Sequence, residues 1–177
     1  MTVEKLVKIY DQDGEVAEPA TREEAERKGL IIATVVVALF NTDGEVWLSL
    51  RSHDKSTHPG MWDITVAGCV DEADGSNLDA AQREVKEETG LDVDLHSAGK
   101  LTFTFGENGG TVTRFPEIFY GTTSDTPEIT DDEVAGFARY PLPVFRHNSE
   151  TYSELYIPTI REEIELAAKH LGIEEES

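Results

Sequence analysis

Three glutamates lie close together in "REVKEETG", residues 83–90, at a spacing suited to binding a cation. In a helix, Glu84 and Glu88 lie one turn apart with their carboxylates side by side, which costs about 0.2–0.5 kcal/mol in like-charge repulsion. Hard divalent cations such as Mg²⁺ bind a few carboxylates together with waters and substrate phosphates. The spacing therefore predicts a metal site whose ion offsets the repulsion, and Arg83 could orient one glutamate through a bidentate contact.

The composition offers a simpler explanation for this cluster. The chain has 36 acidic and 15 basic residues, which give a formal net charge of −21, and its isoelectric point is about 4.4. In such a chain a row of glutamates can be an ordinary solvated helix face. The same charge disfavours nucleic acid and anionic membranes as partners, and it would also suit a protein of a high-salt cytoplasm.

The length and the cysteine content limit the class of protein. A chain of 177 residues suits one domain, residues 1–177. The longest apolar run, from Gly29 to Phe40, is shorter than the roughly 20 residues that cross a bilayer. The first 15 residues lack the pattern of a secretion signal. A single cysteine, Cys69, allows no internal disulfide. We therefore expect a cytoplasmic protein.

The apolar pattern alternates between periods of two and 3.6, which indicates a mixed α/β fold. Residues 1–30 read as a hairpin around Asp13-Gly14 and a short helix that ends at Gly29. Six strands are then expected, in "IIATVVVALF", "EVWLSLRS", "MWDITVAGCV", "LDVDLHSAGKLTFTFG", "GTVTRFPEIFYGTT" and "FARYPL". A last helix begins at Pro158 and ends at Gly172, and residues 172–177 read as a solvated tail.

The glutamates lie on a helix expected over residues 77–89. Leu78, Ala81 and Val85 recur at spacings of three and four, so they predict an apolar stripe that packs on the sheet. Glu84, Glu87 and Glu88 are expected to point elsewhere, toward a ligand.

The stretch "GCVDEADGSNLDAAQREVKEETGL", residues 68–91, resembles the signature box of Nudix hydrolases. The second half matches the family pattern at every fixed position, from Arg83 to Leu91. The first half is displaced by one residue: the family spacing places the glycine at 69 and the loop glutamate at 75, whereas the candidates are Gly68 and Asp74. One extra residue in "DEADGSN" explains both offsets, and it leaves the loop carboxylate open.

The resemblance covers residues 3 to 170 and implies a Nudix-type α/β/α sandwich with a mixed β-sheet between helices. It also implies hydrolysis of a diphosphate bond in a nucleoside diphosphate-linked or related small molecule, by attack of water at phosphorus with Mg²⁺ or Mn²⁺. The implied metal ligands are Glu84, Glu87, Glu88 and the Gly68 carbonyl. Glu87, Glu88 and Arg83 are the implied catalytic residues, with Glu87 as a further ligand or the base. Homodimers are common in this family, so a homodimer is an expected assembly.

Other residues around the expected cleft are weaker candidates. Arg51 and Lys55 are scarce positive charges near it and could contact phosphate, with Arg114 as a further option. An additional acid could come from a later segment, and the options are Glu117, Asp131, Asp132 and Glu133. His53 and His58 read as loop residues, and Trp62 and Phe105 as core residues that could instead stack on a base.

Two alternatives stay open. The family branch also contains isopentenyl diphosphate isomerases, which place a cysteine just before the box glycine and use histidine ligands. Here Ala67 takes that place and Cys69 follows Gly68, where it reads as a small buried apolar residue. The other alternative is a Nudix module that senses a nucleotide without cleaving it, but such a module should have lost the helix carboxylates.

Overall fold

A computed structural model describes residues 5–107 and 110–173, and side chains in 105–112 lie outside what it describes. Its largest sheet has the order β12-β5-β4-β11-β8, with β6 paired to β5 and β7 paired to β4. The β4–β11 pair is parallel and the other pairs of this sheet are antiparallel. The strands are β4 (Thr34–Phe40), β5 (Val46–Arg51), β6 (Trp62–Ile64), β7 (Val66–Cys69), β8 (His96–Lys100), β11 (Glu117–Thr122) and β12 (Val134–Tyr140).

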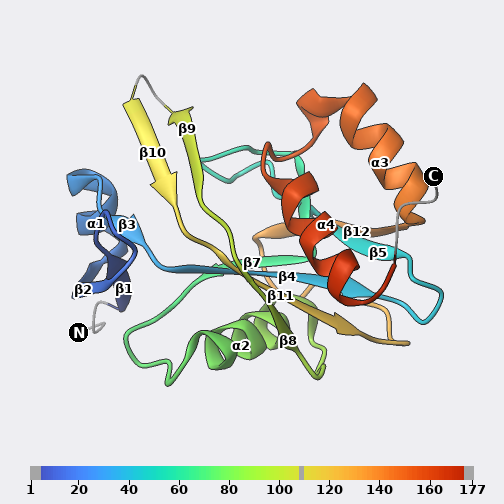
Figure 1. Cartoon of the computed structure of the whole chain (residues 1–177), viewed down its shortest axis with the longest axis horizontal. Helices are drawn as coiled ribbons and strands as arrows, with labels where there is room; N and C mark the ends of the chain where they lie inside the picture. Colours follow the sequence, from blue (N-terminus) through green and yellow to red (C-terminus); the bar gives the residue numbers. More distant parts are fainter. Residues whose placement is uncertain (1–4, 108–109, 174–177) are drawn as a thin grey trace.

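Helices cover both faces of this sheet (Figure 1). Along β4, Val35 and Val37 pack into a core with α2 (Asn77–Thr89), whereas Val36 and Ala38 pack into a second core with α3 (Leu142–Thr151) and α4 (Ile160–His170). Side chains alternate between the faces of a strand, so an uninterrupted apolar strand needs a cover on each side. The expected α/β/α sandwich is therefore confirmed.

A small sheet with the order β2-β1-β3 forms beside the main sheet from β1 (Leu6–Tyr10), β2 (Val16–Thr21) and β3 (Ile31–Ile32). The expected hairpin is the β1–β2 pair. The expected helix is α1 (Arg22–Lys28), where the Thr21 side chain accepts a hydrogen bond from the Glu24 backbone and Gly29 takes a left-handed conformation with φ 65°.

Several expected strands are divided in the structure. "IIATVVVALF" forms β3 and β4 because Ile31 and Ile32 pair with β1, while the chain beyond Ala33 joins the main sheet. "MWDITVAGCV" forms β6 and β7, which pair with different strands. The stretch from 91 to 123 forms four strands, since a two-stranded sheet of β9 (Phe103–Glu107) and β10 (Gly110–Arg114) separates β8 from β11.

Helix α3 and a short 3-10 helix, Ser153–Leu155, were not expected from the sequence. Residues with weak helix propensity fill α3, and two prolines flank its start. The helix is instead stabilised by tertiary packing, because Leu142, Phe145 and Ser149 are buried on one side of it.

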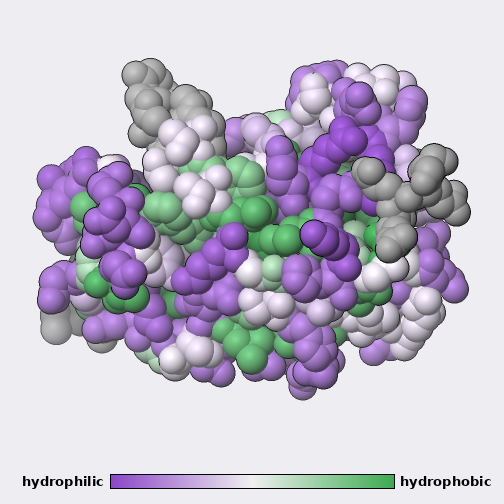
Figure 2. Space-filling model, viewed as in Figure 1, coloured by the Kyte–Doolittle hydropathy of each residue, from purple (hydrophilic) through white to green (hydrophobic). Residues whose placement is uncertain are grey.

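The surface agrees with the acidic composition. Figure 2 shows hydrophilic residues over much of one face of the molecule. Among the described residues, no helix has both the length and the apolar character needed to cross a membrane.

Candidate active site

A cavity of about 480 Å³ lies where the small sheet, helix α2 and the start of α4 meet. Six of the 15 lysines and arginines line it, namely Lys5, Arg22, Arg51, Lys55, Arg83 and Arg114. Eight acidic residues line it as well, so an anionic ligand would depend on a bound cation together with these lysines and arginines; the acids are Asp63, Asp71, Glu84, Glu87, Glu88, Asp131, Glu133 and Glu163. The three box glutamates line the same cavity.

Helix α2 begins and ends where the sequence predicts, at Asn77 and Thr89. The Ser76 side chain accepts a hydrogen bond from the Asp79 backbone, and Gly90 ends the helix at φ 71°. The predicted apolar stripe is partly wrong, because Leu78 is 38% exposed. The buried face is centred on Ala81, Val85 and Glu88, which leaves Leu78 at its margin in the first turn.

Glu88 does not point away from the buried face as expected. Its side chain lies within that face and is 6% exposed. Burial raises the pKa of the Glu88 carboxyl well above its ordinary value of 4.5, and four acidic neighbours act in the same direction: Glu84, Asp131, Glu133 and Asp63. No lysine or arginine among the described residues forms an ion pair with Glu88. A cation bound there would remove this electrostatic penalty.

Arg83 contacts two glutamates of the box and two aspartates of the loop before it. Its Nε and Nη2 donate to the two carboxylate oxygens of Asp74, at 3.0 and 2.8 Å. Its Nη1 donates to Glu84 Oε1 at 2.6 Å and to Glu87 Oε2 at 3.2 Å, and Nη2 also lies 3.1 Å from Asp71 Oδ2. These partners raise the pKa of Arg83, and Arg83 lowers the pKa of Asp74.

The contact with Arg83 shows where the displaced loop carboxylate, Asp74, lies. Asp74 forms a bidentate pair with Arg83 and also accepts a hydrogen bond from the Asp71 backbone at 2.8 Å. The extra residue of the loop therefore does not prevent a carboxylate from orienting the box arginine. Asp74 positions Arg83, which in turn positions Glu84 and Glu87.

Gly68 in β7 lies against the side chain of Glu84 in α2. A Cβ atom added at Gly68 would be 2.2 Å from the Glu84 Cδ. Glycine is needed here for this close approach, because a methyl group at that position would displace the carboxylate. Burial raises the pKa of Glu84, while the contact with Arg83 lowers it.

Gly68→Ala should therefore lower kcat/KM by about 10- to 100-fold, since a displacement of about 1 Å at a reacting group can cost that much. Steady-state kinetics would measure the loss. The matched control is Gly136→Ala in β12, where an added Cβ meets nothing within 4 Å. A Gly68→Ala protein as active as Gly136→Ala would show that Glu84 does not need this position.

Arg51 and Lys55 both line the cavity, and each already has a protein partner. Arg51 Nη1 donates to Asp63 Oδ2 at 3.1 Å, and its Nη2 donates to the Thr57 carbonyl at 2.9 Å. Lys55 Nζ lies 2.7 Å from Glu133 Oε2. Arg51 thus fixes the loop after β5, and Lys55 joins that loop to the segment before β12. Their contact with phosphate remains a prediction.

The four candidates for an additional acid fall into two groups. Asp131 and Glu133 line the cavity, whereas Asp132 and Glu117 are not among its lining residues. Glu117 instead accepts hydrogen bonds from Asn77 and Ser97, both at 2.8 Å. The Thr130 hydroxyl donates to the Glu87 carbonyl, which ties the segment carrying Asp131 and Glu133 to α2.

The remaining candidates are placed as follows. His58 lines the cavity, while His53 packs against Gly60 instead. Trp62 packs against the core on the α4 face, and the Phe105 side chain lies outside the described residues. Cys69 is half-buried and lines the cavity, so the expectation of a buried apolar residue is only partly right. Burial raises the pKa of its thiol.

Three buried acids in the cavity wall, Asp63, Asp71 and Glu163, were not predicted. The sequence contained a signal for Glu163. In a helix it lies on the same side as Ile160 and Ile164, which are both buried. An acid within an apolar stripe is unusual. For Asp63 the signal was an acid inside the apolar segment "WDITV".

The acid Glu163 should give the protein a pH-dependent stability. Burial and the nearby Asp63 raise the pKa of Glu163 from 4.5 to about 8. Between these values the folded state binds more protons than the unfolded state, so the free energy of unfolding falls as the pH rises from 4.5 to 8. Glu163→Gln should remove a slope of up to about 1 kcal/mol per pH unit in urea unfolding at pH 5 to 8. Glu162→Gln, its exposed neighbour, should change the slope only slightly, because the charge of Glu162 contributes less to the pKa of Glu163 than burial does. Parallel curves for all three proteins would contradict this assignment.

The oxygen donors of the box suit a hard divalent cation, and their excess negative charge favours one. Within the described residues, no three His, Cys, Asp or Glu side chains already converge on a common point for a metal ion. Arg83 Nη1 contacts Glu84 Oε1 and Glu87 Oε2. A carboxylate has a second oxygen, which can bind a cation while this contact is kept.

Comparison with known proteins identifies the family of this chain. A family model described as the NUDIX domain matches residues 30–157. A Pseudomonas aeruginosa protein, named as an uncharacterised Nudix hydrolase, is 31% identical over 140 residues, which cover 78% of this chain and 79% of that protein. An isopentenyl-diphosphate Delta-isomerase of Pectobacterium atrosepticum is 29% identical over 133 residues, which cover 74% of this chain and 73% of that protein. The crystal structure of DR0079 from Deinococcus radiodurans has a TM-score of 0.72 at 19% identity, and the match covers 92% of this chain and 98% of that one. The chain therefore belongs to the Nudix hydrolase family.

Proposed function

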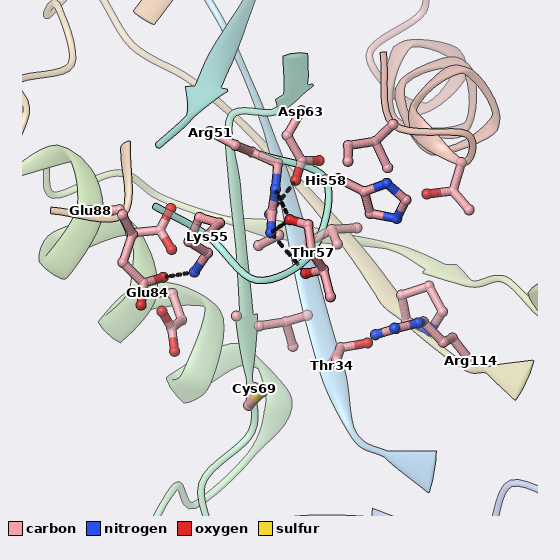
Figure 3. Close-up of a pocket in the computed structure, with 18 of the residues that line it drawn as sticks. Thr34, Arg51, Lys55, Thr57, His58, Asp63, Cys69, Glu84, Glu88 and Arg114 are labelled. Atoms are coloured by element: carbon pink, nitrogen blue, oxygen red, sulfur yellow. Dashed lines mark hydrogen bonds and ion pairs between the residues drawn. The ribbon is translucent and has the colours of Figure 1, made fainter. Parts of the chain in front are cut away.

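We propose that this protein hydrolyses a diphosphate bond in a nucleoside diphosphate-linked or related small molecule, with Mg²⁺ or Mn²⁺ as cofactor. The observation that carries the proposal is Glu88, a buried carboxylate that forms no ion pair with a lysine or arginine of the described residues and lies beside Glu84 in the cavity. Figure 3 shows both glutamates on the same side of this cavity, with Lys55 and Arg51 nearby.

Each box residue has a proposed role. Glu84, Glu88 and the Gly68 carbonyl would hold the cation, with Glu87 as a further ligand or as the base that accepts a proton from the attacking water. A bound divalent cation supplies neutralisation of the phosphate oxygens and a water of lowered pKa. Arg83 orients Glu84 and Glu87 through its contact with Asp74. The cations of the cavity wall would hold the anionic substrate.

The test is chromatographic detection of the hydrolysis products, namely phosphomonoesters, pyrophosphate and phosphate, with a panel of nucleoside diphosphates and triphosphates, nucleotide sugars, dinucleotide polyphosphates and isopentenyl diphosphate. We expect turnover of at least one nucleotide with Mg²⁺ or Mn²⁺ and loss of turnover with EDTA. No turnover of any diphosphate with either ion would reject the proposal, and binding of a nucleotide without turnover would instead favour a sensing module.

The isomerase alternative is kept because of one observation: the Cys69 thiol lines the same cavity (Figure 3). Hydrolysis by the box glutamates needs no thiol, so Cys69→Ala should keep diphosphate hydrolysis within about threefold. Isomerisation of isopentenyl diphosphate that disappears in Cys69→Ala would establish the alternative.

A further inference from the structure

Glu163 lies in a different part of the cavity wall from the box glutamates. It comes from α4, it is 4% exposed, and it lines the cavity together with Asp63, His58 and Thr159. Figure 3 shows Asp63 and His58 on the side of the cavity away from Glu84. A buried carboxyl at this position costs folding free energy, and an apolar side chain would pack α4 onto the sheet without that cost. The proposed hydrolysis does not use Glu163.

The surroundings of Glu163 favour its uncharged form. Asp63 accepts hydrogen bonds from Arg51 Nη1 at 3.1 Å and from the Ile64 backbone N–H at 2.8 Å. Burial raises the pKa of Asp63, and these two contacts lower it. The charges of Asp63 and Glu162 raise the pKa of Glu163 and the Thr159 hydroxyl lowers it, while burial has the largest effect. No lysine or arginine forms an ion pair with Glu163 among the described residues. A protonated carboxyl both donates and accepts a hydrogen bond.

We propose that Glu163 recognises the part of the substrate beyond the diphosphate, by pairing with an uncharged group that offers a hydrogen-bond acceptor beside a donor. Nucleobase edges and amides have this arrangement. A hydrocarbon chain would offer this buried carboxyl no hydrogen bond in addition to the one with Thr159. The cavity volume of about 480 Å³ lies within the usual range for small-molecule sites. The inference rests on the proposed function. It restricts the proposed substrates to those that carry a hydrogen-bond acceptor beside a donor.

The test separates recognition of this group from binding of the diphosphate. KM and kcat would be measured for Glu163→Met and Glu163→Gln with the best substrate among ADP, GDP, CDP, UDP and ADP-ribose. The inhibition constant of methylenediphosphonate, which carries no such group, would be measured with the same proteins. Glu162→Gln is the matched control, since it changes the exposed neighbouring acid.

We expect Glu163→Met to raise KM at least tenfold, to change kcat less than threefold and to leave the inhibition constant unchanged. Glu163→Gln should remain within threefold of the wild-type KM because an amide also donates and accepts. Thermal unfolding should show Glu163→Met to be at least as stable as the wild type, which separates recognition from misfolding.

Three results would overturn the inference while the hydrolase assignment stands. The KM of Glu163→Met could be unchanged, or its inhibition constant for methylenediphosphonate could change as much as its KM. Glu163→Gln could also be as impaired as Glu163→Met. A wild-type protein that turns over only isopentenyl diphosphate would also overturn it. No turnover of any substrate by the wild type would reject the proposed function first, and the inference with it.

Discussion

Glu88→Gln should lower kcat for the proposed hydrolysis by about 10³-fold, equivalent to roughly 4 kcal/mol of transition-state stabilisation. Glu88 is the most buried of the three box glutamates, and no lysine or arginine in the described part of the chain forms an ion pair with it, so a bound metal would depend on its charge. Glutamine keeps the shape of the side chain but removes that charge. Steady-state turnover with Mg²⁺ and with Mn²⁺ measures the effect.

The stability of the same variant should change in the opposite direction. Without metal, Glu88→Gln should unfold at the same temperature as the wild type or higher, because it removes a buried acid from a group of like charges. The wild type should gain thermal stability on adding Mn²⁺, and the variant should gain less. Glu23→Gln, an exposed acid on α1, should behave as the wild type in both measurements. Turnover of Glu88→Gln within tenfold of the wild type would remove Glu88 from the proposed metal site.

Arg83→Gln should lower both activity and stability. The guanidinium contacts four carboxylates and the Cys69 carbonyl, and its loss leaves Asp71 and Asp74 facing each other with less compensation. Breaking such a partly buried network costs roughly 3 kcal/mol in the free energy of unfolding. Activity should fall by about 10²-fold, because Glu84 and Glu87 lose the contact that orients them.

A double-mutant cycle with Asp74→Asn tests the mechanism of this effect. Because Asp74 and Arg83 form a bidentate pair, the two substitutions together should cost less than the sum of the single ones, with a coupling energy of about 1–3 kcal/mol. Urea unfolding provides the free energies. Arg27→Gln, an exposed arginine on α1, serves as the control. Additive effects of Arg83→Gln and Asp74→Asn would contradict the assignment of Asp74 as the residue that positions Arg83.

Local signals in the sequence were sufficient to place the first and last residues of helix α2. The N-cap serine, the closing glycine and the apolar residues at helical spacing all act within a few residues of each other. The same is true of the β1–β2 hairpin and of α1. The sandwich followed from the continuous apolar run of β4, since such a strand must be covered on both faces.

The other features of the fold depended on contacts between residues that are far apart in the sequence. Helix α3 forms because Leu142 and Phe145 have a sheet to pack on, and its local propensity is weak. The division of residues 31–40 into two strands depends on which partners lie beside Ile32 and Thr34. The sequence could not show that Glu117 is engaged by Asn77 and Ser97, 40 and 20 residues away.

The sequence by itself was sufficient to recognise the box and to predict the chemistry proposed for it, because the spacing of the box residues depends only on helix geometry. Only the tertiary structure decided which charged side chains lie close to one another. Only in the fold does Asp74 reach Arg83, does Glu88 lie in the buried face of its helix, and do Asp63 and Glu163 come to line one cavity from β6 and α4. The physical reason is that burial and electrostatic interaction depend on distance in space, and residues 100 positions apart in the sequence can be neighbours in the folded chain.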